Sequence, residues 1–390
     1  MNKVIPLFKV FMSENVDKPL LDTLHSGFIG EGPKVLEFED TLKKHLQTEN
    51  VLTTNSGTSA LHLAYHLCHE YGRYQVYTTP ITCTATNNPI IHNGYSIVWV
   101  DVDPITGNIT PETLKNALEE NYHEPCGYPT TAAVSIVHWG GNPCDVLGIL
   151  KVIKSKQFSE TYGEYFDSYK GLKLIEDGAH SLGMEYKGKP FGFYSDFAIH
   201  SFQAIKHITA GDGGCLICKN KEDYERAKLL RWYGIDREVK ESVDLRCELD
   251  IAEAGYKFHM NDLAATIGNE NFKYLPQILQ KHRENAKYYD QMFKGKVKFV
   301  PENPNGKSAY WLYTIHVENR DELMQKLKED GIISSKVHSR NDTHSMFAEF
   351  KRDLPGVESF NKTHLCIPVG WWVTEEDREF IAKKVLEYAK

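Results

Sequence analysis

Short apolar segments alternate with segments of helical spacing over most of the chain, and this alternation limits the possible folds more than any other feature. The spacing predicts strands at residues 51–54, 75–78, 96–102, 131–137, 172–176, 197–200 and 215–218, and helices at 35–47, 56–71, 85–92, 111–120, 146–156 and 222–232. Strands joined by helices of this length pair as parallel strands, and the helices then cover both faces of the sheet. The sequence therefore predicts an α/β fold with a large, mostly parallel sheet.

The pattern changes in the last third of the chain. A long helical stretch over 261–293, broken near Pro276, leads into strands predicted at 297–300, 310–317 and 332–337 and helices predicted at 320–328 and 375–390. We therefore expect a large domain over residues 1–275 and a small C-terminal α+β domain over residues 276–390. Within the large domain, the acidic and aromatic run 158–171 is predicted to be a surface insertion, and residues 237–254 to be a charged loop.

Composition excludes several function classes. The formal net charge is −8 and no basic run is present, which disfavours a nucleic-acid partner. No apolar run approaches the roughly 20 residues of a membrane span, so we expect no membrane association. The N-terminal run 1–13 faintly resembles a signal peptide, but Lys9 interrupts its apolar part, and acidic residues follow. We therefore expect an ordinary N-terminus and a cytoplasmic protein.

The cysteines do not indicate a metal site. Eight cysteines are scattered along the chain, and only Cys215 and Cys218 form a C-x-x-C pair, which lies within a predicted strand. No second cysteine pair or histidine cluster has the spacing of metal ligands, so no metal is expected. Scattered cysteines in apolar segments are typical of buried free thiols in a reducing compartment.

The segment 196–214, D-F-A-I-H-S-F-Q-A-I-K-H-I-T-A-G-D-G-G, points to chemistry. Lys206 follows a predicted core strand and precedes a glycine turn, which is an unusual place for a solvated ammonium. A desolvated lysine has a lowered pKa, and its free amine can condense with a carbonyl group. An exposed loop lysine is the alternative, and it is the better interpretation when Lys206 is considered alone.

Two other segments change that balance. The segment N-S-G-T-S-A opens a predicted helix with Gly57, Thr58 and Ser59. Free backbone N–H groups at a helix start favour an anion, and the hydroxyls can add hydrogen bonds to it. A simple helix cap remains the alternative. Asp177 ends the strand L-I-E-D, where a carboxylate needs a partner such as a protonated pyridine nitrogen; a helix cap is equally compatible. With Ser201 as a further phosphate contact, these segments and Lys206 supply what pyridoxal 5′-phosphate requires.

These blocks resemble the DegT/DnrJ/EryC1/StrS family of nucleotide-sugar aminotransferases over nearly the whole chain. The resemblance implies a fold-type I pyridoxal-phosphate transferase. Lys206 would bond to the cofactor and transfer the proton, Asp177 would contact the pyridine nitrogen, and His180 would lie near the ring oxygen. Gly57, Thr58 and Ser201 match phosphate contacts of the family, and V-H-W-G-G at 137–141 matches its H-x-[YF]-G loop.

The chain departs from the family pattern at two places. The aromatic residue that stacks on the ring is replaced in P-I-T-C-T-A-T, where Cys83 or Thr84 stands at its position. The segment that reaches the phosphate from the other subunit has Lys257 in G-Y-K-F-H, as in relatives that aminate 4-keto sugars. A cation there suits a phosphate, and it implies a homodimer with shared active sites.

The resemblance implies an enzyme that transfers an amino group from glutamate to a nucleotide-linked keto sugar. A 4-keto-6-deoxyhexose is the substrate we expect, in amino-sugar biosynthesis of the lipopolysaccharide, O-antigen or capsule type. His338 and Arg340 match the region that closes over the substrate, although an exposed polar loop is an equally good interpretation. The alternatives are a 3-keto sugar aminotransferase, a sugar 3-dehydratase that uses the amine form of the cofactor, and a non-enzymatic sensor. Family dehydratases carry histidine at the position of Lys206, which favours amino transfer here.

Overall fold

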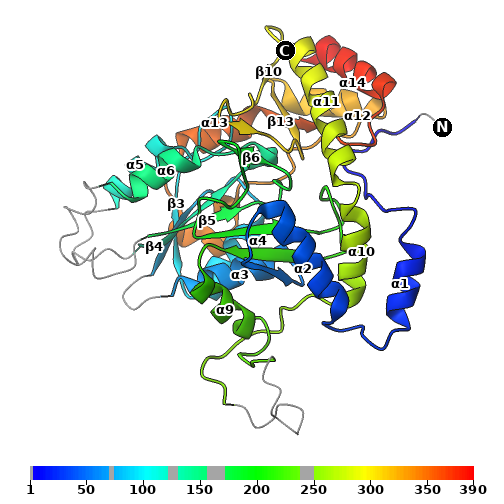
Figure 1. Cartoon of the computed structure of the whole chain (residues 1–390). Helices are drawn as coiled ribbons and strands as arrows, with labels where there is room; N and C mark the ends of the chain where they lie inside the picture. The colour runs from blue at the N-terminus through cyan, green and yellow to red at the C-terminus, as the bar shows by residue number, and fades with distance from the viewer. Residues whose placement is uncertain (1–2, 70–73, 122–130, 156–171, 238–249) are drawn as a thin grey trace.

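A seven-stranded sheet forms the centre of the molecule (Figure 1). The computed structural model of the chain describes residues 3–69, 74–121, 131–155, 172–237 and 250–390. The strands of this sheet are β1 (Val51–Thr54), β2 (Gln75–Thr78), β3 (Ser96–Trp99), β4 (Thr131–Val137), β5 (Lys173–Asp177), β8 (Phe197–Ser201) and β9 (Gly214–Cys218). Their order is β1-β9-β8-β5-β4-β2-β3. Each of the seven predicted strands of the large domain is present.

Strand β9 is antiparallel to both of its neighbours, while β8, β5, β4, β2 and β3 pair in parallel. The prediction of a mostly parallel sheet is therefore confirmed. Because β9 runs in the opposite direction, its first residue lies at the same edge of the sheet as the carboxyl ends of the other strands. Across this edge Gly214 is the register partner of both Thr54 and Ser201, and Asp177 is the partner of Val137. The ends of distant chain segments therefore meet at one edge.

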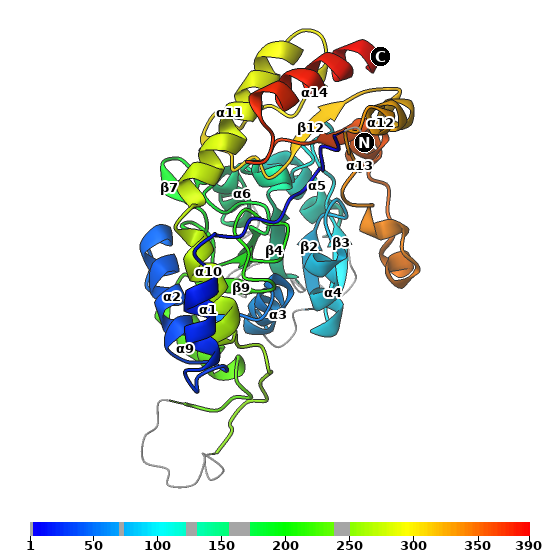
Figure 2. The same ribbon diagram turned by 90° about the vertical axis from the view of Figure 1, so that its right-hand side faces the viewer.

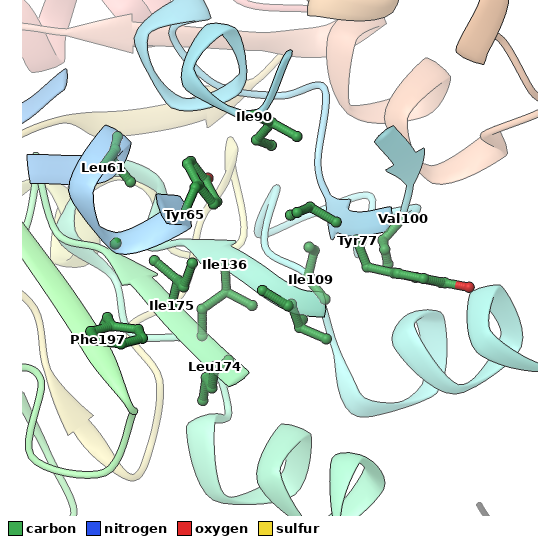
Figure 3. Packing of buried hydrophobic residues seen from close by; sticks show 14 of the residues in the cluster. Leu61, Tyr65, Tyr77, Ile90, Val100, Ile109, Ile136, Leu174, Ile175 and Phe197 are labelled. Carbon is green, nitrogen blue, oxygen red and sulfur yellow. The ribbon is translucent and has the colours of Figure 1, made fainter. Parts of the chain in front are cut away.

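Helices cover both faces of the sheet. Around the sheet lie α2 (Pro33–Leu46), α3 (Gly57–Leu67), α4 (Thr84–His92), α5 (Pro111–Glu120), α6 (Val146–Ile153), α9 (Lys221–Leu230) and α10 (Asp262–Phe272). Leu61 and Tyr65 of α3 pack with Ile136, Ile175 and Phe197 in one core cluster (Figure 3). Apolar residues of α2 pack with Ala265 of α10 in a second cluster. Two successive residues of β9, Leu216 and Ile217, belong to the first and second clusters respectively, so the two clusters lie on opposite faces.

A second, antiparallel sheet lies in the C-terminal part of the chain, above the large sheet in Figure 1. It consists of β10 (Lys298–Phe299), β12 (Tyr313–His316) and β13 (His364–Ile367), and it packs with α11 (Leu275–Phe293), α12 (Arg320–Glu329) and α14 (Glu375–Tyr388). The described residues also form α1 (Asp17–Leu24), α13 (Pro355–Thr363) and the short sheet of β6 (Glu185–Tyr186), β7 (Lys189–Pro190) and β11 (Gly306–Lys307). Short 3₁₀ helices lie at Trp139–Gly141, Asn341–Thr343 and Ser345–Phe350.

The N-terminal segment links the two parts of the molecule. It runs from the C-terminal part, beside α12, down to α1 next to α10 (Figure 2). Ile5 forms a parallel bridge with Ile332, and the Trp372 indole N–H donates to Pro6 O at 2.9 Å. Phe8, a few residues further, stacks on Trp311. Residues 5–8 therefore pack against the C-terminal part of the chain.

One predicted strand is wrong. Residues 332–337 do not form a strand; Ile332 and Ser335 make only isolated bridges. Val337 has φ = 67°, a left-handed backbone conformation that a continuous strand does not allow. The strand that completes the small sheet is instead β13, which pairs with β12 and which the sequence pattern did not reveal. The predicted insertion 158–171 and most of the charged loop 237–254 lie outside the described residues.

The C-x-x-C pair lies within β9, as predicted. Cys215 and Cys218 are both buried, and they belong to core clusters on opposite faces of the sheet. A spacing of three residues places two side chains on opposite faces of a strand, so the two thiols cannot bind one ion. Among the helices of the described residues, none has both the length and the apolar character needed to cross a membrane.

Candidate active site

A cavity of about 310 Å³ opens at the edge where the strand ends meet. Its walls come from the first turn of α3, the start of α4, the ends of β4, β5 and β8, the turn after β8, and the C-terminal segments around 311 and 338. The predicted site residues that line it are Gly57, Thr58, Cys83, Asp177, His180, Ser201, Lys206 and His338. Residues up to 330 positions apart in sequence, Phe8 and His338, therefore share one cavity.

The first turn of α3 forms one end of the cavity. Ser56 caps this helix, because its hydroxyl accepts the Ser59 N–H at 3.0 Å. The N–H groups of Gly57 and Thr58 have no acceptor within the helix, and both residues line the cavity. A helix N-terminus with free N–H groups binds an anion such as a phosphate. Ser201, at the end of the neighbouring strand, adds a hydroxyl to the same wall.

Two glycines allow this close approach of strand and helix. A Cβ on Gly57 would lie 3.0 Å from the Cβ of Ser201, and a Cβ on Gly214 would lie 2.5 Å from the backbone nitrogen of Gly57. Backbone atoms cannot yield to such a contact as the end of a flexible side chain can. The start of α3 can therefore rest on the sheet edge only because Gly214 has no side chain.

Asp177 lies at the end of β5 and is almost completely buried. One carboxylate oxygen, Oδ1, accepts the Ala179 N–H at 3.0 Å, and Oδ2 accepts the Thr86 hydroxyl at 2.7 Å. A hydroxyl of Thr82 lies 2.8 Å from that of Thr86. These contacts fix the orientation of a carboxylate that lines the cavity, as a partner for a protonated ring nitrogen requires.

Lys206 lies in a tight turn five residues beyond β8. Its N–H donates to Gln203 O at 2.9 Å, and its Nζ lies 3.7 Å from the centre of the Trp311 ring. Burial lowers the pKa of the Lys206 amine from 10.5 to about 8, against the opposing charges of Asp177 and Cys83. An amine with this pKa is partly neutral near pH 7, as a nucleophile must be.

Two histidines of the cavity are kept neutral. Burial lowers the pKa of His180 well below its usual value, and burial lowers that of His338 to about 3, with Lys206 adding to both effects. Nδ1 of His180 and Nε2 of His338 are buried without a hydrogen-bond partner among the described residues. The two rings lie nearly parallel, 5.5 Å apart. A ligand in the cavity can satisfy both nitrogens, which buried polar atoms generally require.

These features fit pyridoxal phosphate. The cavity combines a helix N-terminus with a hydroxyl for the phosphate, a fixed carboxylate for the pyridine nitrogen, and an amine of lowered pKa for the aldehyde. The unpartnered Nδ1 of His180 suits the ring oxygen. The residues that would hold the cofactor are therefore Gly57, Thr58, Ser201, Asp177, His180 and Lys206.

Three predicted residues do not line the cavity. Ser59 is buried, and its hydroxyl donates to Asn55 Oδ1 at 2.6 Å, so it belongs to the helix cap. Arg340 is paired with Asp342 and Glu358, and both carboxylates compete with any substrate anion for its guanidinium. Lys257 is exposed, with its Nζ 3.5 Å from the centre of the Trp232 ring.

Cys83, predicted at the position of the stacking aromatic residue, is exposed at the start of α4 and lines the cavity. A cysteine has no aromatic face, so no ring occupies this position.

The structure also brings in residues that sequence reasoning missed. Trp311 and Phe8 line the cavity, and Thr86 binds Asp177. Trp311 lies 105 positions from Lys206 and belongs to no recognisable motif. Thr86 could have been predicted from the sequence, because it lies one helical turn after Cys83 in the segment P-I-T-C-T-A-T.

The large sheet and the cavity at its edge match one type of enzyme. A mostly parallel sheet flanked by helices, with a lysine and a strand-end aspartate at its carboxyl edge, is the architecture of a fold-type I pyridoxal-phosphate enzyme. The profile of the DegT/DnrJ/EryC1/StrS aminotransferase family matches residues 11–386. The chain therefore belongs to this family, and it is a pyridoxal-phosphate-dependent aminotransferase.

Solved structures and curated relatives agree with this membership. The chain is 36% identical to AtS13 from Actinomadura melliaura, with a TM-score of 0.89 and 98% of each chain covered. It is 25% identical to the PLP form of a putative sugar aminotransferase from Streptococcus pneumoniae, with a TM-score of 0.86 and 98% of each chain covered. It is also 30% identical to a UDP-4-amino-4,6-dideoxy-N-acetyl-beta-L-altrosamine transaminase of Campylobacter jejuni subsp. jejuni, with 95% of each chain covered.

Proposed function

We propose that this enzyme transfers an amino group from glutamate to C4 of a nucleotide-linked 4-keto-6-deoxyhexose. The observation that carries the proposal is the free amine of Lys206, with its pKa near 8, in the same cavity as Asp177. A family dehydratase has histidine in place of this lysine, so the lysine favours amino transfer. The product is an amino sugar, and we propose that it enters a surface polysaccharide.

Two relatives support C4 as the position of amination. One is the Campylobacter jejuni transaminase, whose name contains a 4-amino-4,6-dideoxy sugar. The other, from Saccharopolyspora spinosa, is a dTDP-4-dehydro-2,3,6-trideoxy-D-glucose 4-aminotransferase that is 29% identical over 82% of this chain. Lys257 matches the family members that aminate 4-keto sugars and supports the same position.

The bound cofactor supplies an aldehyde that accepts and returns the amino group, and a ring that withdraws electrons from the reacting carbon. Lys206 Nζ, once released from the cofactor, takes the proton from the Cα of glutamate and later delivers a proton to C4 of the sugar. Asp177 keeps the proton on the ring nitrogen, because its fixed carboxylate stabilises a positive charge there. The start of α3 and Ser201 hold the phosphate and so orient the ring.

His338 is the residue of the C-terminal part that we assign to the sugar. Its Nε2 is buried, unpartnered among the described residues and part of a cavity-lining side chain. A neutral imidazole at this place can hydrogen-bond a hydroxyl or carbonyl group of the sugar without adding charge. We do not extend the assignment to Arg340, since two carboxylates already bind its guanidinium.

We further propose that the enzyme is a homodimer in which Lys257 of one subunit contacts the cofactor phosphate of the other. The exposed Lys257 ammonium lies on the Trp232 ring and does not line the cavity of its own chain. A cation at this position suits a phosphate on a second subunit.

The test is product analysis with labelled donor. The purified enzyme, loaded with pyridoxal phosphate, is incubated with ¹⁵N-glutamate and a panel of UDP-, dTDP- and GDP-linked 4-keto and 3-keto sugars. We expect one 4-keto-6-deoxy substrate to gain a single ¹⁵N atom, as detected by mass spectrometry, with the nitrogen placed at C4 by NMR.

Two variants control this assay. Lys206→Ala removes the amine, and we expect it to abolish ¹⁵N incorporation. Lys219→Ala removes an exposed lysine that directly follows β9, and it should leave incorporation unchanged. A product that lacks a hydroxyl group and carries no ¹⁵N would instead establish the dehydratase. Incorporation at C3 would establish the 3-keto alternative.

A further inference from the structure

The turn that carries Lys206 is held on both sides by one segment of the C-terminal part, residues 309–311. The Trp311 indole N–H donates to Ile205 O at 3.0 Å, just before Lys206. His207 Nε2 donates to Ala309 O at 2.9 Å, just after it. Since 102 or more residues separate these partners, the contacts are purely tertiary. They fix the backbone of the turn relative to the indole.

The Trp311 ring itself is the surface that the Lys206 amine touches. The Nζ lies 3.7 Å from the ring centre, within the range of a cation–π interaction. Phe8 stacks on the same indole at 4.8 Å, and His180 stacks on it at 3.9 Å. The ring is therefore fixed by its neighbours, and it is almost completely buried.

The backbone before Trp311 is strained in a way that serves this arrangement. Tyr310 has φ = 47°, in the left-handed region that residues other than glycine seldom adopt. Two hydrogen bonds hold it there: His282 Nδ1 donates to Tyr310 O at 2.8 Å, and the Tyr310 N–H donates to the Ser308 hydroxyl at 3.0 Å. Strain that is maintained by surrounding contacts is concentrated at functional sites.

We propose that Trp311 is a positioning residue for Lys206, whose indole face holds the lysine amine whenever that amine is not bonded to the cofactor. The inference deepens the proposed function, since it treats Lys206 as the residue that bonds to the cofactor and is released once in each half of the reaction. When Lys206 is not bonded to the cofactor, its amine must stay beside the reacting carbon, and it needs a contact in the cavity that keeps it there. The indole face provides that place.

The charge on the amine depends on several groups that face it. Asp177 on β5 and Cys83 at the start of α4 favour the protonated amine, whereas burial disfavours it. His180, His207 and His338 surround it and are kept neutral, chiefly by burial. An aromatic face stabilises the ammonium further. Weakening the ring's negative face should therefore lower the pKa of Lys206 while every other group stays in place.

Fluorinated tryptophans provide that change without altering the shape of the side chain. Fluorines are added one by one to Trp311 by site-specific incorporation, and the same amino acids are placed at Trp371 as the matched control. In the cofactor-free protein, competitive acetylation over a range of pH, followed by peptide mass spectrometry, measures the pKa of Lys206. We expect the pKa to fall by about half a unit to one unit over the series at position 311, and to stay constant over the series at position 371.

A second measurement tests positioning. Trp311→Leu removes the aromatic face, and Trp371→Leu is its control. Capture of pyridoxal 5′-phosphate, in which the Lys206 amine condenses with the aldehyde and one water is released, is followed by absorbance above pH 9. We expect the rate to fall roughly tenfold in Trp311→Leu only, because the turn loses the indole hydrogen bond to Ile205 O, and the amine, neutral at this pH, loses the surface beside it.

A constant Lys206 pKa along the series at position 311, or an equal shift along the series at position 371, would overturn the proposal. So would equal capture rates in the two leucine variants. If Trp311→Leu does not fold, the Lys206 pKa along the fluorinated series still tests the proposal. The acetylation experiment contains neither cofactor nor sugar, so its failure is distinct from a failure of the proposed function, which would appear only as missing ¹⁵N incorporation.

Discussion

At the scale of single residues, the site depends on the different effects of burial on acids and bases. Desolvation favours the neutral form of every group, and therefore lowers the pKa of Lys206, His180 and His338 together. Asp177 receives two hydrogen bonds, from Ala179 and Thr86, which fix the orientation of its carboxyl group. The cavity thus contains an amine of lowered pKa and a fixed carboxyl group, the combination that cofactor capture requires.

The first prediction concerns pH. Because the pKa of Lys206 is lowered to about 8, its neutral fraction rises about tenfold per pH unit below pH 8 and then levels off. Capture of pyridoxal phosphate by the cofactor-free enzyme, measured by absorbance, should follow the same curve. An ordinary lysine would give a rate that still rises at pH 10, and that result would contradict the desolvated position of Lys206.

The second prediction concerns Asp177. Asp177→Asn keeps the shape of the side chain but removes the charge that holds a proton on the pyridine nitrogen. We expect cofactor capture by Lys206 to persist, while the rate of amino transfer falls about 100-fold or more. Stopped-flow absorbance after addition of glutamate measures that rate.

Asp196→Asn is the matched control for this change, since Asp196 lies before β8 at the opposite edge of the sheet, where it accepts the Leu174 N–H at 3.0 Å. Its rate of amino transfer should stay within about twofold of that of the unchanged enzyme. Equal losses in both variants would mean that the effect of Asp177→Asn is one of folding and not of chemistry.

At the scale of elements, the antiparallel strand β9 connects the two halves of the cofactor site. Its first residue, Gly214, pairs with Thr54 on β1 and with Ser201 on β8. The first turn of α3 rests directly on this glycine. The proposed phosphate contacts therefore depend on the pairing of the ends of β1, β9 and β8. A glycine is needed at the end of β9 because the start of α3 lies directly against it.

The third prediction tests this contact. In Gly214→Ala the new Cβ would lie 2.5 Å from the backbone nitrogen of Gly57, so the start of α3 must move. We expect a loss of about 1–3 kcal/mol in the free energy of unfolding and weaker binding of pyridoxal phosphate, measured by urea denaturation and by cofactor titration.

Gly30→Ala is the control, because no atom lies within 4 Å of the added Cβ. Its free energy of unfolding should change by no more than about 0.5 kcal/mol. If Gly214→Ala bound the cofactor as tightly as Gly30→Ala, the phosphate would not be held at the start of α3.

At the scale of the whole molecule, the cavity is closed by parts of the chain that are far apart in sequence. Phe8 comes from the N-terminal segment, and Trp311 and His338 come from the C-terminal part. The bridge between Ile5 and Ile332 ties these two parts together. Lys257, in contrast, does not line the cavity of its own chain, and we propose that it acts on the site of a second subunit.

The fourth prediction tests that role by complementation. The Lys206→Ala and Lys257→Ala chains are each nearly inactive at limiting cofactor, and they are mixed under conditions that exchange subunits. If Lys257 acts across the interface, each mixed dimer has one intact site, and random mixing restores about a quarter of the activity. If Lys257 acts within its own chain, mixing restores no activity. Amino transfer from ¹⁵N-glutamate measures the recovery.

The strands of the large sheet, its mostly parallel arrangement and the residues at its carboxyl edge could all be predicted from the amino-acid sequence. These follow from local rules. Apolar runs of a few residues form strands, helical connections make the strands parallel, and parallel strands bring Asp177 and the Lys206 turn to one edge. The family resemblance then assigned chemistry to that edge. The start of α3 was predictable for the same reason, since its glycine and hydroxyls directly follow a strand.

The distant side chains that complete the cavity could not be predicted from the sequence, because they meet only in the folded chain. Trp311 meets Lys206 because strained Tyr310 turns the chain there, and no local pattern encodes that turn. Strand β13 completes the small sheet instead of the strand expected at 332–337, a segment that makes only isolated bridges and ends in the left-handed backbone of Val337. Arg340 appeared available in the sequence, but in the fold two carboxylates bind it. Contacts of this kind depend on how separate helices, strands and loops pack together. The spacing of residues along one helix or strand does not tell which other segment will pack against it.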